Sequence, residues 1–252
     1  MTPVDIGPFA IAQPVVARGD IAANVARHLV LVEAAARQGA RLVLFPELAL
    51  TGYEPSLAAA LALDAGAPAL EPLREAAVRL GIAVVTGAPW KTAGLPRIAA
   101  LSFLPDGTLQ VYTKQYLHAG EEAAFAAGDG GAGLRLGGAS VALAVCADIA
   151  HGDHAAAAAH CGADLYAASM LVSENGYETD AGLLRGYARE HRMPVAMANH
   201  GGPTGGWACA GRSALWDENG NIVIAAGGAG ECLLLARRDR DGWHGKAIDP
   251  AT

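Results

Sequence analysis

Short, strongly apolar segments alternate with alanine-rich helical stretches along most of this 252-residue chain, and this alternation constrains the fold more than any other feature. Apolar runs of roughly four to eight residues, bounded by Gly, Pro or polar residues, are typical of strands covered on both faces. Strands that alternate with helices predict an α/β fold built on a mixed sheet with helices outside. The predicted strands are Phe9–Ala12, Leu42–Phe45, Ile82–Thr86, Ile98–Leu104, Val141–Val145, Ala163–Ala168 and Val195–Ala198.

The helical stretches between these strands have recognisable ends. Asp20 is a suitable N-cap, because its side chain can accept a hydrogen bond from the first turn. Gly39 and Gly81 are suitable helix stops, because glycine readily adopts the left-handed conformation that ends many helices. The predicted helices are Asp20–Gln38, Ala67–Leu80, Asp153–His160 and Asp180–His191.

Two hairpins and the absence of a linker complete the organisation of the chain. Residues 103–113 place Asp106–Gly107 between two strand-like runs, and residues 214–225 turn at Asn219–Gly220. Asp-Gly and Asn-Gly pairs favour the tight turns of hairpins. Because no repeat, low-complexity linker or composition break divides the chain, we expect one domain over residues 1–252, with the Gly-rich stretch 127–138 as surface turns.

Composition excludes several function classes. Hydrophobic residues make up 52% of the chain, which excludes disorder, and the net charge of −7 argues against nucleic acid as the main partner. No apolar stretch is long enough to span a membrane, so we expect no membrane association. The N-terminal segment carries the acidic residue Asp5 and lacks the basic stretch that opens a signal peptide, so no signal peptide is expected. Four scattered cysteines without a CxxC pair favour free thiols and a cytoplasmic location.

Three residues stand out as candidates for chemistry. Glu47 follows a predicted buried strand and a proline, and the carboxyl ends of such strands are where α/β sheets place their sites. It could also be an N-cap or a surface carboxylate. Cys146 ends another predicted strand and leads into a helix, a setting that activates thiols, although lone cysteines are more often small buried hydrophobic residues. Lys114 ends a hairpin strand in a chain with few lysines, but an edge lysine often prevents edge pairing.

Together, these three segments resemble the carbon–nitrogen hydrolase (nitrilase) superfamily. The segments are LVLFPELALTGY at residues 42–53, YTKQYL around Lys114 and VALAVCADI around Cys146, and they contain the family's Glu–Lys–Cys triad in chain order. The resemblance covers the chain from about residue 8 to about residue 236. It implies a four-layer αββα sandwich and a homodimer or larger homo-oligomer.

The resemblance also implies a mechanism. Cys146 would attack the carbonyl or nitrile carbon and form a covalent acyl-enzyme. Glu47 would be the general base, and Lys114 would stabilise the developing oxyanion together with the backbone N–H of Ala147. This mechanism needs no cofactor and no metal.

A second glutamate often accompanies this triad in the family. Glu121 and Glu122 both follow Lys114 closely, and the family's Glu–x₃–Phe–x₂–Gly pattern favours Glu121. The spacing from the lysine does not exclude Glu122.

The substrate is expected to be a small amide. Nitrilases of this superfamily tend to have Trp-Glu after the cysteine, whereas this chain has Ala147-Asp148, which favours amides over nitriles. Met170 stands where the family usually has an aromatic residue. Together with Ala147 and Met170, we expect Tyr53 and Asn199 to line the substrate pocket.

Other functions stay open at this point. The same triad would also serve a hydrolase of nitriles or of N-carbamoyl compounds. A catalytically idle subunit that keeps the fold for binding or assembly is a further alternative, although all three residue types of the triad are present.

Overall fold

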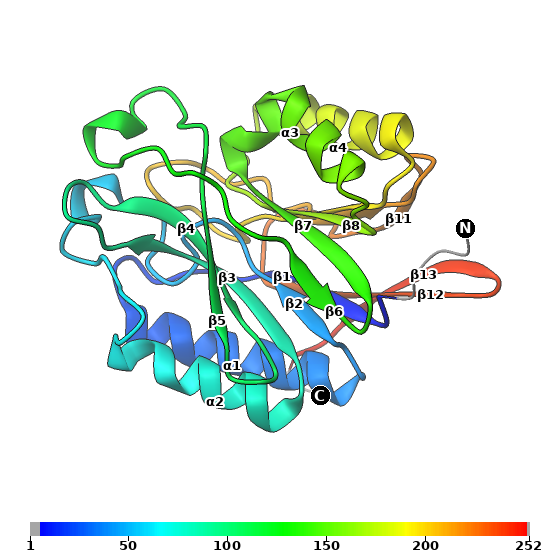
Figure 1. The fold of residues 1–252 in the computed structure, drawn as a ribbon, viewed down its shortest axis with the longest axis horizontal. Coiled ribbons are helices and arrows are strands. Elements are labelled where there is room, and N and C mark those ends of the chain that lie inside the picture. The colour runs from blue at the N-terminus through cyan, green and yellow to red at the C-terminus, as the bar shows by residue number, and fades with distance from the viewer. Residues whose placement is uncertain (1–5, 251–252) are drawn as a thin grey trace.

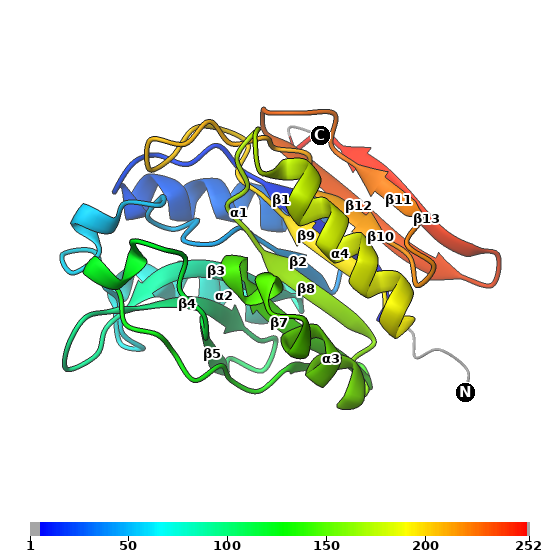
Figure 2. The same ribbon diagram turned by 90° about the horizontal axis from the view of Figure 1, so that it is seen from above.

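Two β-sheets pack face to face, with helices on the outer face of each, in the computed structural model of the chain (Figures 1 and 2). The structure describes residues 6–250, so Asp5 and the expectation of no signal peptide lie outside it. No helix in the described part of the chain has the length and apolar content that crossing a bilayer requires.

The larger sheet has seven strands, three of which form a parallel core. In spatial order they are β13 (Gly242–Ile248), β12 (Cys232–Asp239), β1 (Phe9–Gln13), β2 (Leu42–Leu44), β3 (Ala83–Trp90), β4 (Arg97–Phe103) and β5 (Leu109–Thr113). β1, β2 and β3 run parallel, and every other neighbouring pair is antiparallel. The sheet is therefore mixed, as the alternation predicts.

The smaller sheet has six strands and repeats this plan. In spatial order they are β11 (Ile222–Ala225), β10 (Ala214–Trp216), β9 (Val195–Ala198), β8 (Leu165–Ser169), β7 (Ala139–Val145) and β6 (Leu134–Leu136). β7, β8 and β9 are parallel, and the outer pairs are antiparallel.

Two helices cover each sheet. α1 (Ile21–Arg37) and α2 (Glu71–Leu80) pack on the larger sheet, and α3 (Gly152–His160) and α4 (Tyr177–His191) pack on the smaller one (Figure 1). Asp20 caps α1, since its side chain accepts a hydrogen bond from the backbone N–H of Ala23 at 3.0 Å. Gly81 ends α2 in the left-handed conformation, with φ of +64°. Gly39, with φ of +77°, directly follows the last capping residue of α1, Gln38. All three predicted helix ends are therefore confirmed.

The core lies in three apolar layers. Alternate strand residues point to opposite faces of a sheet, so Leu42 and Leu44 pack between the two sheets while Val43 packs under α1 and α2. The third layer, which includes Tyr166 and Leu184, lies between the smaller sheet and α3 and α4. These layers confirm the predicted four-layer αββα sandwich.

Three strands were not predicted. β6 lies within the stretch 127–138, which we expected to form surface turns, and β12 and β13 form a hairpin after the last predicted element. β6 is short and Gly-flanked, and most residues of β13 are exposed or half-buried, so neither presents an apolar run. The hairpin of β12 and β13, and not the one at residues 214–225, closes the larger sheet beside β1.

Candidate active site

Glu47 lies just beyond the C-terminal end of β2, in a tightly constrained turn. The next residue, Leu48, has a φ of +50°, which is uncommon for a residue with a side chain. The backbone of Gly87 approaches so closely that an added Cβ would lie 2.1 Å from the backbone nitrogen of Leu48. His200 makes a hydrogen bond of 2.7 Å from Nε2 to the backbone oxygen of Glu47. These contacts fix the direction of the buried Glu47 side chain.

Lys114 follows β5 and is completely buried. Its Nζ donates to Glu47 Oε1 at 2.7 Å and to Glu121 Oε1 at 2.8 Å. An ammonium group has three N–H bonds, so this arrangement leaves one of them for a further acceptor. The predicted association of Glu47 and Lys114 is therefore a direct ion pair.

The structure places Glu121, and not Glu122, against the lysine. Glu121 begins a short 3₁₀ helix, Glu121–Ala123, and its carboxylate also accepts hydrogen bonds from the Tyr53 hydroxyl and the His118 backbone N–H, both at 2.8 Å. Glu122 points elsewhere and accepts from the backbone N–H of Gly120. Glu121 therefore joins Lys114 and Tyr53 in one network.

Cys146 follows β7 directly, at a sharp turn. Its φ of +43° is rare for a residue with a Cβ atom, and a 3₁₀ helix, Cys146–Ala150, starts at once. The thiol lies 3.7 Å from the backbone oxygen of Leu171. Ala147 is near the N-terminus of this short helix, where backbone N–H groups have no acceptor within the helix. An oxygen bound beside Cys146 could therefore accept a hydrogen bond from Ala147.

Asp148 ties the cysteine turn to the lysine turn, a role that the sequence analysis missed. One carboxylate oxygen accepts from the Val145 backbone N–H at 3.0 Å and from the Tyr112 hydroxyl at 2.7 Å. The other accepts from the backbone N–H groups of Gln115 and Tyr116 at 2.9 and 3.0 Å. The residue before Cys146 and the residues after Lys114 thus share one buried carboxylate.

Burial governs the charges of the triad. Burial raises the pKa of Glu47 to about 7, because Lys114 only partly offsets the lost hydration and the charge of Glu121 adds to the increase. Burial, and then the carboxylate of Glu47, raise the pKa of the Cys146 thiol. Burial opposes the charged form of Lys114, but the negative charges around it, that of Glu47 foremost, outweigh burial and raise the pKa of its ammonium group. At neutral pH the site therefore holds a neutral thiol, a cationic lysine and a glutamate close to its titration point.

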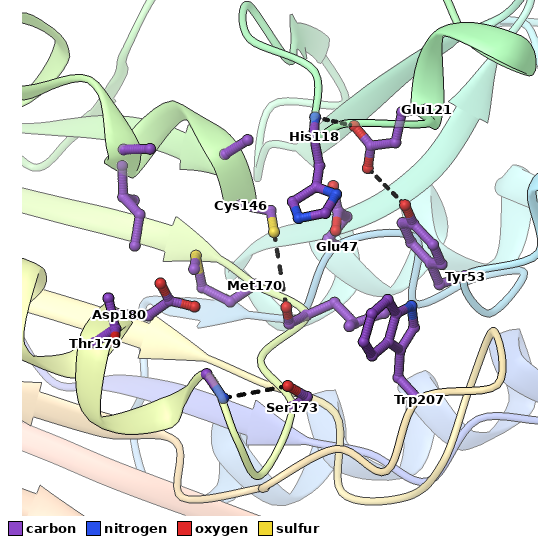
Figure 3. A pocket seen from close by; sticks show the side chains of 15 residues that line it. Glu47, Tyr53, His118, Glu121, Cys146, Met170, Ser173, Thr179, Asp180 and Trp207 are labelled. Carbon is purple, nitrogen blue, oxygen red and sulfur yellow. Dashed lines mark hydrogen bonds between the residues drawn. The ribbon is translucent and has the colours of Figure 1, made fainter.

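A cavity of about 360 Å³ opens over these residues (Figure 3). Glu47 Oε2 is buried there and has no hydrogen-bond partner within residues 6–250, although polar atoms in protein interiors are nearly always paired. The other lining residues come from both halves of the sandwich. They are Tyr53, His118, Glu121, Cys146, Ala147, Ile149, Ala150, Met170, Leu171, Ser173, Gly176, Thr179, Asp180 and Trp207.

Three of the four residues that the sequence analysis expects in the pocket line the cavity. Tyr53, Ala147 and Met170 line the cavity. Asn199 does not line it, which corrects the expectation that it would. Its side chain is buried and exchanges two hydrogen bonds with the backbone of Val172 and donates a third to Gly211, so no polar group is left for a substrate.

Within the described residues, no group of three His, Cys, Asp or Glu side chains is arranged to hold a metal ion. His154, one of the histidines of α3, instead bonds the hydroxyl groups of Tyr112 and Tyr166 at 2.8 and 2.7 Å.

Solved structures of one amidase resemble this fold closely. The NitN amidase of Nesterenkonia sp. AN1 is 29% identical, with a TM-score of 0.86 over 93% of this chain and 94% of that chain. An alanine-for-cysteine variant of that amidase in complex with butyramide is 28% identical, with a TM-score of 0.84 over 98% of this chain and 92% of that one. Another variant carries the acetamide moiety of fluoroacetamide covalently on its active-site cysteine, at 29% identity and a TM-score of 0.83 over 92% of this chain and 90% of that one.

Curated relatives match a shorter segment. Glutamine-dependent NAD(+) synthetases of Mycobacterium tuberculosis and Mycobacterium bovis are 38% identical over 136 residues, which cover 50% of this chain and 19% of the synthetases. The match thus spans less than a fifth of those relatives. Residues 9–245 match the family model described as carbon-nitrogen hydrolase, which is nearly the whole chain. The chain belongs to the carbon–nitrogen hydrolase family.

Proposed function

We propose that the protein hydrolyses small aliphatic amides to a carboxylic acid and ammonia through a thioester on Cys146. The observation that carries this proposal is the unpartnered Oε2 of Glu47, which is buried at the cavity that also contains the Cys146 thiol. The other oxygen of Glu47 is held at 2.7 Å by Lys114. One carboxylate is thereby oriented by a cation and keeps a free oxygen for proton transfer.

In the first half of the reaction, Cys146 becomes acylated. The thiol proton passes to Glu47 Oε2 while the sulfur forms a bond to the amide carbon. The carbonyl oxygen becomes an oxyanion, which accepts hydrogen bonds from the third N–H of Lys114 and the backbone N–H of Ala147. Glu47 then gives its proton to the leaving nitrogen, the carbon–nitrogen bond breaks, and ammonia leaves a thioester behind.

In the second half, water releases the acid. Glu47 accepts a proton from the attacking water, and the same two donors stabilise the second oxyanion. The carbon–sulfur bond breaks, and the thiolate of Cys146 takes the proton back from Glu47. A base whose pKa lies near 7 suits this exchange, because it must both accept and release a proton in each turnover.

The substrate class follows from the size of the cavity and from the structural neighbour. A cavity of about 360 Å³ is at the small end of ligand pockets. The neighbouring amidase has been captured with butyramide, which supports aliphatic amides of similar size for this chain.

The test is ammonia release by the purified protein from acetamide, propionamide and butyramide, with butyronitrile and an N-carbamoyl amino acid in parallel. Cys146→Ser is the matched control, since it keeps the shape of the side chain but has a far weaker nucleophile. Release from the amides by the wild type and none by the control would support the proposal. Ammonia release from the nitrile alone, or from the carbamoyl compound alone, would mean that this compound class, and not amides, is the substrate.

If no substrate releases ammonia, the alternative of a catalytically idle subunit would be favoured. The rate of alkylation of Cys146 by fluoroacetamide would then be compared with the rate for a free cysteine. The raised pKa keeps this thiol neutral, so a faster rate would mean that Glu47 takes the thiol proton as the sulfur attacks. The homodimer and the cytoplasmic location stay predictions.

A further inference from the structure

A carboxylate that takes no part in the proposed chemistry lies in the wall of the cavity. Asp180 is in the first turn of α4, half-buried, and its side chain makes no hydrogen bond or ion pair within residues 6–250. Glu178 in the same turn behaves differently: it is exposed and lies 3.5 Å from Arg212. One acidic residue of this turn therefore has a cation beside it, and the other faces the cavity without one.

The rest of the cavity offers Asp180 little compensation. No lysine or arginine is among the described residues that line the cavity. Lys114, which is buried beside Glu47, is already bound to Glu47 and Glu121. Loss of hydration raises the pKa of Asp180, and the imidazole of His118 opposes this increase. The Asp180 carboxylate is partly hydrated in the cavity, and a ligand that supplies a cation or an N–H group would replace part of this hydration with a charge-assisted hydrogen bond.

The position of Asp180 defines which part of a substrate it would meet. In Figure 3, Asp180 and Thr179 lie to one side of Cys146, together with Met170, while Tyr53 and Trp207 lie to the other. Asp180 belongs to the helix layer, whereas Glu47 and Lys114 belong to the opposite half of the sandwich. It is thus placed for the acyl chain of a substrate, away from the base and the lysine.

We propose that Asp180 is a specificity-determining residue that binds an ammonium group on the acyl chain of the amide, so that the preferred substrates are amino-substituted aliphatic amides. This inference rests on the amidase function proposed above. An ammonium group on the acyl chain would form a charge-assisted hydrogen bond with Asp180, and apolar contacts with Met170 and Ile149 would accompany the methylene groups. A carboxylate on the chain would meet the like charge of Asp180 and be rejected.

The experiment compares kcat/KM within pairs of amides that differ by one group. Glycinamide is paired with propionamide, 3-aminopropanamide with butyramide and 4-aminobutanamide with pentanamide, so that an ammonium replaces a methyl group each time. At least one amino amide is expected to exceed its partner by about tenfold to a hundredfold, the range for a hydrogen bond between charged groups. Succinamate, which carries a carboxylate, is expected to be the poorest substrate.

Variants of α4 identify the residue responsible. Asp180→Asn is expected to reduce the preference for the amino amide to about one, and Asp180→Glu to restore part of it. Glu178→Gln removes a negative charge from the same helical turn without touching the cavity, so its preference ratio should equal that of the wild type. Circular dichroism verifies that each variant is folded.

The possible outcomes separate this inference from the proposed function. Hydrolysis of butyramide without any preference for amino amides, or a preference that survives in Asp180→Asn, would overturn the inference and leave the amidase function standing. If no amide is hydrolysed, the affinities of 3-aminopropanamide and butyramide for Cys146→Ala are measured by calorimetry. Equal affinities, or no binding of either amide, would overturn the inference in that case.

Discussion

Replacing Glu47, the general base of the proposed reaction, should stabilise the protein at alkaline pH while it abolishes activity. Burial raises the pKa of Glu47 from its ordinary value of 4.5 to about 7, so the folded state favours the protonated form. The stability that comes from protonating Glu47 is fully present below pH 4.5 and is lost as the pH rises through about 7. At about 1.4 kcal/mol for each pH unit, this increase corresponds to about 3 kcal/mol.

Glu47→Gln removes this titration and keeps an oxygen that can accept from Lys114. The free energy of unfolding is measured in urea from pH 5 to pH 8.5 for both proteins. Relative to the variant, the wild type should lose about 2 to 3 kcal/mol over this range, most of it between pH 5 and pH 7.5. Ammonia release by the variant should be undetectable at every pH, because no base remains for the thiol.

The sign of the effect separates two physical accounts of the site. A difference between the proteins that does not change with pH would refute the raised pKa. A difference that grows in favour of the wild type as the pH rises would mean that the attraction of Lys114 exceeds the effect of burial. Glu33→Gln is the control, since Glu33 forms an exposed ion pair with Arg79 and such pairs contribute little. Its difference from the wild type should stay within about 0.5 kcal/mol across the series.

Two further substitutions test how the site is held. Gly87→Ala should reduce the free energy of unfolding by at least about 2 kcal/mol, because its Cβ would lie 2.1 Å from the backbone nitrogen of Leu48. Gly94→Ala, where no heavy atom lies within 4 Å, is the control, and equal stability of the two variants in urea would contradict this prediction. Tyr53→Phe removes the hydrogen bond to Glu121 and should lower kcat for butyramide about tenfold with little change in KM, as measured by steady-state kinetics. An unchanged kcat would mean that the tyrosine does not position the network.

The sequence could indicate those site residues that lie at the ends of predicted strands. Glu47 lies just beyond β2, Lys114 follows β5 and Cys146 follows β7, so the pattern of apolar runs and turns made each a candidate. The resemblance to the carbon–nitrogen hydrolase superfamily then joined the three into one triad. The same runs predicted a mixed sheet covered by helices, because a strand covered on both faces is apolar on both. The four layers were expected from the family resemblance. Strands with exposed faces, such as β13, present no such pattern and were missed.

Contacts between distant segments could not be predicted in the same way. The roles of Asp148 and Asn199 depend on which backbone groups happen to lie within reach, and those groups come from turns about 30 residues away. Asn199 resembled a pocket residue in sequence because it follows a central strand. Its amide instead holds the loop at Val172, and a hydrogen bond of this kind leaves no mark on composition or periodicity.

Under the two proposals above, the division of the cavity between the two sheets separates catalysis from substrate choice. Glu47 and Lys114 project from the larger sheet and are fixed by a close backbone contact and a buried ion pair. Asp180 comes from the first turn of α4, in the opposite layer, and shares no hydrogen bond with either of them. Asp180 shares no hydrogen-bond partner with Glu47 or Lys114, so we expect a change of charge at Asp180 to leave the base and the lysine in place. A chain of this fold could therefore exchange one acyl group for another by substitutions in α4 while its thioester chemistry stays the same.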